Sequence, residues 1–247
     1  MSRDSTRKVL TVAFLVCLVC SILVSVAAIG LKGGQVKNQE EEKWRNILQI
    51  AGLYDPAKSV DEQFKKVSSR SVDLASGEFV TAVDADSPYV IPPEKDLAGI
   101  KVRPRNMEVY LVEEDGKLQQ MILPVYGKGL WSTMYGFIAL APDLTTVSGF
   151  GFYQHGETPG LGGEIDNQSW LAKWPGKRVY NEQGEVKLKV LKGSVDAASV
   201  NAQYQIDGIS GATLTARGVS NLLAYWLGEN GYKPFLAGLR KDGGMQP

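Results

Sequence analysis

The sequence predicts an α+β protein: a single N-terminal transmembrane helix followed by an extracytoplasmic domain with a mostly antiparallel sheet flanked by helices. Three features predict this fold. A run of uncharged apolar residues lies near the start, stretches of apolar residues occur in pairs around short turns, and helical patterns lie apart from these pairs. Hairpin-forming strands with helices set apart from them are typical of α+β domains.

The membrane segment is Val9–Leu31, a run of 23 residues without a charged side chain. At about 1.5 Å per residue, such a helix is roughly 35 Å long and crosses a bilayer with some tilt. A cleavable signal peptide has a shorter apolar core, although Ser25-Val26-Ala27 resembles a cleavage site. A lipoprotein anchor needs a small residue before its cysteine, whereas valine precedes both Cys17 and Cys20. The run length therefore favours a retained anchor.

The charges around this segment predict its orientation. Three basic residues lie within positions 1–8, whereas the two lysines that follow the span are succeeded by three glutamates at 40–42. The positive-inside rule therefore places residues 1–8 in the cytoplasm and nearly all of the remaining chain outside. Cys17 and Cys20 are the only cysteines, and we interpret them as small apolar residues of the membrane helix rather than a redox or metal pair.

The overall charge excludes some function classes. The 27 basic residues balance the 27 acidic ones, so no basic excess indicates a nucleic-acid partner. His155 is the only histidine, and one histidine without a cysteine outside the membrane cannot build a typical zinc site. We therefore expect no nucleic acid, no metal site and no catalytic residue, and a hydrogen-bonded structural role for His155.

Residues 32–84 are expected to form a helical stalk and packing segment. Apolar residues at helical spacing predict a helix over 36–51 that ends at Gly52. Ser59 and Glu62 form a capping-box pattern, which predicts a second short helix to about Lys66. Prolines make residues 85–105 an irregular connection at the start of a domain over 85–240, and residues 241–247 are a tail.

Strands are expected to begin near Met107. Asp115-Gly116 between two apolar stretches is a strong hairpin signal, and Pro142-Asp143 separates a second pair. The expected strands are Met107–Glu113, Leu118–Val125, Gly136–Leu140, Thr146–Phe152 and Lys187–Leu191. The expected helices are Gln168–Lys173 and Ala212–Gly228.

Two glycine-rich stretches, 126–136 and 155–164, follow strand candidates. Neither has the spacing of a phosphate loop or a dinucleotide fingerprint. Glycines at this density let the backbone approach a flat ligand, and apolar side chains beside them would supply a pocket wall. Ordinary tight turns with core aromatics are the alternative interpretation. The candidate pocket residues are Leu130, Trp131, Glu157, Thr158, Gly160 and Leu161.

The stretch Asp207-Gly208-Ile209-Ser210-Gly211-Ala212-Thr213 is a turn that leads into a helix. We expect Ser210 to be the N-cap, with Gly211, Ala212 and Thr213 in the first helical positions. A phosphate on Thr213 would lie where helix N–H groups favour an anion, and Arg217 lies four residues on, on the same face. Asp207 would either assist deprotonation of the threonine hydroxyl or close the turn.

Two other interpretations of this stretch remain. A serine nucleophile would use Gly208-Ile209-Ser210-Gly211-Ala212, but the final glycine of that motif is missing and His155 precedes Ser210 in the chain. A plain helix cap without chemistry is the default for Ser-Gly-Ala-Thr taken alone.

The stretch 207–213 resembles the flavin-attachment motif Asp-Gly-x-Ser/Thr-Gly-Ala-Thr of the FMN-binding domain family. In that family the final threonine carries FMN through a phosphoester bond, attached by a periplasmic flavin transferase that uses FAD. The resemblance implies covalent FMN on Thr213, with Asp207, Ser210, Gly211, Ala212 and Arg217 around it.

From its anchor to about residue 240, the chain is similar to the C subunits of sodium-translocating NADH:quinone oxidoreductases. The shared features are the anchor, the motif and both glycine-rich stretches. The resemblance implies a bacterial inner-membrane flavoprotein that passes electrons inside a complex, with other membrane subunits, the flavin transferase and membrane lipid as partners. The G subunits of ferredoxin:NAD oxidoreductases share the anchor and the Ser/Thr-Gly-Ala-Thr motif, but the run at 127–136 is more similar to the quinone reductase subunits. Another membrane-anchored flavoprotein with a different acceptor, and a subunit without a cofactor, are further alternatives.

Overall fold

The computed structural model describes residues 6–81 and 88–241. The chain forms two compact units, residues 1–43 and residues 44–247. Part of the expected cytoplasmic segment, the expected boundary between residues 84 and 85, and the tail beyond residue 241 lie outside the described residues.

The first helix, α1 (Thr6–Ile50), joins the expected membrane segment and the expected helix over 36–51 into one element. It is the one helix, among the residues described, that is long and apolar enough to cross a membrane. Within the first unit the large apolar side chains between Val9 and Leu31 are exposed to the surroundings. Contiguous apolar surface of this extent requires a partner, and lipid is the partner that an uncharged helix of this length suits.

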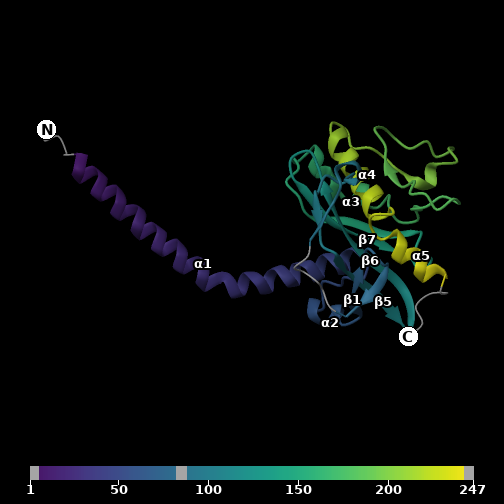
Figure 1. The fold of residues 1–247 in the computed structure, drawn as a ribbon, viewed down its shortest axis with the longest axis horizontal. Coiled ribbons are helices and arrows are strands. Elements are labelled where there is room, and N and C mark those ends of the chain that lie inside the picture. Colours follow the sequence, from purple (N-terminus) through teal and green to yellow (C-terminus); the bar gives the residue numbers. More distant parts are fainter. Residues whose placement is uncertain (1–5, 82–87, 242–247) are drawn as a thin grey trace. The chain divides into compact units, whose positions relative to one another are not determined.

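The second unit is built on one six-stranded sheet in the order β2-β1-β5-β6-β7-β8, in which all neighbours are antiparallel (Figure 1). Its strands are β1 (Val67–Asp73), β2 (Glu78–Val80), β5 (Asn106–Glu114), β6 (Lys117–Lys128), β7 (Thr133–Leu140) and β8 (Val147–Gln154). Two small ribbons accompany it: β3 (Tyr89–Val90) pairs with β4 (Val102–Arg103), and β9 (Lys189–Val190) runs parallel to β10 (Gln205–Ile206). The mostly antiparallel sheet is as the sequence predicts.

Short helices and the C-terminal helices complete this unit. The α-helices are α2 (Val60–Phe64), α3 (Gln168–Leu171), α4 (Thr213–Trp226) and α5 (Lys233–Lys241), and the 3-10 helices are η1 (Pro93–Lys95), η2 (Gly162–Asp166) and η3 (Ala202–Tyr204). Ser59 caps α2 by accepting a hydrogen bond from the backbone N–H of Glu62, as its capping-box pattern predicts.

The two faces of the sheet carry separate apolar clusters. The last turns of α1 and the short α2 cover one face, where Ile47 and Leu48 pack against side chains such as Phe137, and Trp44 stacks on Phe64 with ring centroids 4.9 Å apart. The larger cluster on the other face contains the buried side of α4, including Val219. The core of the unit therefore consists of helix, sheet and helix in three layers.

The hairpin at Asp115-Gly116 is confirmed. Glu114 pairs with Lys117, and both turn residues have positive φ, 52° for Asp115 and 72° for Gly116. Two-residue turns of this kind match the twist of the strands that they join. The pairing of β7 with β8 confirms the second predicted pair.

The expectation that strands begin near Met107 is wrong, because β1 and β2 lie within the segment expected to be a helical stalk. The sequence of β1, VSSRSVD, is mostly polar and lacks a clear alternation of apolar residues. Its pairing with β5 over seven residues, from Val67↔Val112 to Asp73↔Asn106, decides its conformation. Helix α5 was not expected either, and the strand expected over 187–191 is reduced to β9.

Candidate functional site

Helix α4 begins at Thr213, and a tight turn leads into it. The backbone N–H of Ala212 donates to the carbonyl of Ile209 at 3.1 Å, and Gly211 inside the turn has a φ of +72°. A left-handed residue at this position of a turn favours glycine. The expected N-cap is therefore wrong: Ala212 occupies the N-cap position, Gly211 and Ala212 precede the helix, and Ser210 is an exposed turn residue.

The first turn of α4 presents unpaired backbone donors. Ala212 provides no side-chain cap, and the first helical hydrogen bond runs from the N–H of Ala216 to the carbonyl of Ala212 at 3.0 Å. Among the described residues, no group accepts from the backbone N–H of Thr213, Leu214 or Thr215. Such donors at the positive end of a helix are a favourable place for an anion.

A groove of about 280 Å³ lies beside Thr213 and carries three basic side chains. Thr213, Ala216, Arg217 and Ser220 line it from α4, and Lys189, Val190, Leu191 and Lys192 line it from β9 and the residues after it. In the described part of the chain, neither Arg217 nor the two lysines form an ion pair with a carboxylate. The groove therefore suits a phosphate attached to or bound near Thr213.

Glu157 connects the two glycine-rich stretches to α4. Only 5 % of its surface is exposed. Its carboxylate accepts hydrogen bonds from the backbone N–H groups of Leu130 (3.3 Å), Trp131 (3.0 Å) and Ser132 (3.4 Å), and from the hydroxyl of Thr215 (2.6 Å). Glu157 was expected to line the pocket, but its side chain points into the protein interior. It affects the site indirectly, because it joins the loop at residues 130–132 to helix α4.

The pKa of Glu157 follows from these bonds. Burial opposes ionisation and would raise the pKa, but the hydrogen bonds from Thr215 and from the backbone of Trp131, Ser132 and Leu130 together outweigh it. The pKa of Glu157 is therefore lower than usual, and the ionised carboxylate is the form that holds the loop.

Four apolar side chains on the first turn of α4 and on the loops connected to it are exposed: Leu130, Trp131, Leu161 and Leu214. We call them the apolar rim. Trp131 is 66 % exposed, although Glu157 holds its backbone in place. Leu161 lies against the turn before α4, because a Cβ on Gly211 would be 2.9 Å from the Leu161 Cδ2 atom. Exposed apolar side chains gathered on connected segments indicate a surface that a ligand or partner covers.

The remaining candidates shape the loops of the site. The carbonyl of Thr158 accepts hydrogen bonds from the N–H groups of Leu161 (3.1 Å) and Gly163 (2.8 Å), and Gly160 has a φ of +74° within that turn. The ring of His155 bonds to Asp166 through Nε2 at 2.6 Å, and its Nδ1 accepts from the N–H of Glu157 at 3.1 Å. His155 is therefore a hydrogen-bonded structural residue, as expected.

Asp207 precedes the turn at residues 209–212 and connects it to neighbouring segments of the chain. Its carboxylate contacts Lys173 Nζ and accepts from the backbone N–H of Val195, both at 2.6 Å, and its carbonyl accepts from Trp170 Nε1 at 2.8 Å. The hydrogen bond from Lys173, followed by that from Val195, lowers the pKa of Asp207. The expected Asx-type closure of its own turn is thus replaced by a bond to Val195.

Three residues of this site were not predicted from the sequence. Lys189 and Lys192 lie more than twenty positions before Thr213, and only the packing of β9 against α4 brings them to the groove. Leu214 belongs to an apolar helical pattern, yet it points away from the core. The available signal for Leu214 was its place beside Thr213, since a helical side chain leans towards the N-terminus of its helix and so lies beside the turn that precedes α4.

Comparisons with known proteins match the segment that contains these residues. The FMN-binding domain family matches residues 129–228, a range that contains α4 and most of both glycine-rich stretches. The C subunit of the Na(+)-translocating NADH-quinone reductase of Pseudomonas aeruginosa is 51% identical and aligns with 97% of this chain and 98% of its own length. The corresponding protein of Yersinia pestis is 43% identical, with 97% and 95% covered.

Solved structures show the same fold. The crystal structure of Shewanella oneidensis NqrC superposes with a TM-score of 0.75 at 32% identity, covering 83% of this chain and 99% of that one. The C subunit of the Parabacteroides distasonis reductase superposes with a TM-score of 0.65 at 29% identity, covering 83% and 96%. These similarities extend over the sheet, the loops and the helices described above, and the chain therefore belongs to the family of Na(+)-translocating NADH-quinone reductase C subunits.

Proposed function

We propose that Thr213 Oγ1 carries FMN through a phosphoester bond and that this chain positions the flavin for electron transfer within a sodium-pumping NADH:quinone oxidoreductase. The observation that carries the proposal is the start of α4. A threonine hydroxyl is the first side chain of the helix, three backbone N–H groups beside it lack acceptors among the described residues, and a groove with three cations adjoins it. A phosphate on this hydroxyl would gain hydrogen bonds and charge neutralisation.

The residues present fit each part of the cofactor. The N–H groups of the first turn, together with Arg217 and Lys192, would hold the phosphate. The apolar rim would seat the flavin ring, and Glu157 would keep Leu130 and Trp131 in position for it. When bound, FMN supplies one- and two-electron transfer. The chain itself contributes orientation, an apolar surface and a fixed local charge.

The proposed organisation places the flavin outside the cytoplasm. Residues 9–31 would cross the bacterial inner membrane with residues 1–8 inside, residues 32–84 would connect the span to the sheet, and residues 85–240 would carry the periplasmic flavin site. Maturation there would require a flavin transferase that uses FAD: the Thr213 oxygen bonds to the FMN phosphorus, AMP leaves, and the hydroxyl proton is released. The other membrane subunits would bind NADH and quinone, because this sequence carries no nucleotide fingerprint.

Mass spectrometry of the intact chain tests the attachment. Co-expression with the flavin transferase should raise the mass by FMN minus water, and Thr213→Ala should abolish the increase. Ser210→Ala is the matched control, because Ser210 is an exposed hydroxyl in the adjoining turn and should leave the increase intact. Flavin on the Thr213→Ala protein would refute the assignment.

A further inference from the structure

Strand β8 is a long and uncovered edge of the sheet. It lies at the end of the strand order and pairs only with β7. Its sequence, VSGFGFYQ, contains no lysine or proline, the residues that commonly prevent an edge from pairing with another chain. The opposite edge, β2, has only three residues. Of the two edges, β8 is therefore the one able to accept a further strand.

Residues 176–177 of the same chain form hydrogen bonds with the first residue of β8 and with no later residue of that strand. The N–H of Val147 donates to the carbonyl of Lys177 at 2.8 Å, and the carbonyl of Val147 accepts from the N–H of Gly176 at 2.8 Å. From Ser148 to Gln154, no backbone group of β8 bonds to any described segment other than β7. Unpaired N–H and C=O groups in a row are a template for an extended chain.

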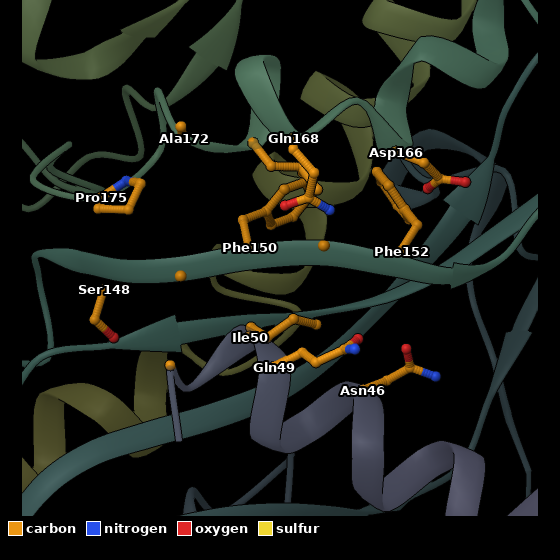
Figure 2. A pocket seen from close by; sticks show the side chains of 14 residues that line it. Asn46, Gln49, Ile50, Ser148, Phe150, Phe152, Asp166, Gln168, Ala172 and Pro175 are labelled. Atoms are coloured by element: carbon orange, nitrogen blue, oxygen red, sulfur yellow. The ribbon is translucent and has the colours of Figure 1, made fainter. Parts of the chain in front are cut away.

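A groove of about 370 Å³ follows the unpaired part of β8 (Figure 2). Asn46, Gln49 and Ile50 from the end of α1 line one side of the strand, and Gln168 and other residues around α3 line the other side. Gly149 permits this arrangement, because a Cβ there would overlap the carbonyl oxygen of Ile50. The edge is thus recessed between two walls, which leaves room for one extended chain but not for the equally walled edge of a second copy.

The chemistry of the groove suits a neutral peptide backbone. Apart from apolar groups its lining consists of amides, a hydroxyl and one carboxylate, and no basic side chain contributes. That carboxylate, Asp166, is already bonded to His155 at 2.6 Å, so the groove offers a phosphate or a metal ion little attraction. The Oγ atom of Ser148 is buried and has no hydrogen-bond partner among the described residues. A peptide group in the groove would supply that partner.

We propose that the edge of β8 from Ser148 to Gln154 binds an extended segment of another protein of the complex, which adds one strand to the sheet. The proposal rests on the proposed function within a multi-subunit oxidoreductase. Main-chain hydrogen bonds would provide the affinity, and the side chains of the α1 and α3 walls would select the segment. This surface would attach the second unit to its partners independently of the flavin.

Hydrogen exchange of the full chain in detergent, alone and within the purified complex, tests the pairing. The outward-facing backbone amides among residues 148–154, which do not donate to β7, should exchange about tenfold more slowly in the complex, since one added hydrogen bond of ~1.4 kcal/mol has that effect. Amides of β2 are the internal control and should exchange alike in both samples. Equal exchange of 148–154 in the two samples refutes the proposal, as does protection in the isolated chain that grows with its concentration, which indicates a second copy.

A variant that fills the groove tests the position. Ala172 lies exposed at the end of α3 and lines the groove, so Ala172→Trp should occupy it without disturbing the sheet. Co-purification with the other subunits should fall about tenfold, whereas Ala172→Ser and Gln183→Trp, at an exposed site elsewhere, should behave as the unmodified chain. Undiminished co-purification of a folded Ala172→Trp chain overturns the proposal. Flavin content, measured by fluorescence of the denatured band, is scored separately, so loss of the flavin and loss of docking are distinguished.

Discussion

The carboxylate of Glu157 should stabilise the loop and the helix that it joins at the proposed flavin site. The substitution Glu157→Gln keeps the shape of the side chain and leaves one oxygen to accept from Trp131 and Ser132. The new amide nitrogen can donate to the hydroxyl of Thr215, which is able to accept, but it cannot accept from the N–H of Leu130. The backbone N–H of Leu130 is therefore left without an acceptor. The remaining hydrogen bonds are made to a neutral amide instead of a charged carboxylate.

The expected cost of this substitution at pH 7 is about 2 kcal/mol, since an unsatisfied buried donor costs about 1–3 kcal/mol. For a unit of this size each kcal/mol lowers the melting temperature by about 2–4 °C, so the midpoint should fall by about 4–8 °C. Thermal unfolding of the full chain in detergent, followed by tryptophan fluorescence, measures the shift. Glu182→Gln, at an exposed turn position outside the site, should change the midpoint by less than about 1 °C.

The pH dependence provides a second check. Because the pKa of Glu157 is lower in the folded protein, its contribution is complete above the unfolded pKa of about 4.3 and is lost as the pH falls through the folded pKa. The difference between the midpoints of the two proteins should therefore stay constant from pH 7 down to about 5, and it should narrow as the pH falls from about 4.3 through the lowered pKa of the folded protein. Equal midpoints at pH 7, or a difference that stays constant as the pH falls through the folded pKa, would refute the argument.

Three further substitutions test the site and the fold. Arg217→Gln should slow flavin attachment by about fivefold, corresponding to ~1 kcal/mol of lost attraction, and unchanged flavin content and redox potential would show that the guanidinium is unimportant for the phosphate. Gly149→Ala should lower the free energy of unfolding in urea by about 3 kcal/mol, because the added Cβ overlaps the carbonyl of Ile50. A decrease of less than about 1 kcal/mol would contradict this close approach of the two segments. Ser59→Ala removes the cap on the Glu62 N–H and should cost about 1 kcal/mol in the same assay, whereas Ser59→Asp, which can still cap, should not.

The sequence by itself determined the features that depend on local physics. The uncharged run Val9–Leu31 predicts a membrane helix because length and apolarity suffice for that conclusion. The hairpin at Asp115-Gly116 follows from residues that tolerate positive φ, and α4 from its apolar spacing. A short contiguous motif likewise makes Thr213 the candidate attachment residue, and in the structure it is the first residue of α4.

The tertiary structure alone decided how distant segments meet. The polar sequence of β1 becomes a strand only by pairing with β5, since the pattern lacks its own signal. Glu157 bonds to Thr215, 58 residues away, and to a loop 25 to 27 residues before it, so no local pattern distinguishes it from a pocket-lining carboxylate. The cap at Ala212 was not predicted for a related reason: the left-handed turn at Gly211 displaces the helix start, and Leu161, fifty residues earlier in the chain, lies against this turn. Contacts between residues far apart in the chain form only when the whole unit packs, and these contacts shape the proposed flavin site.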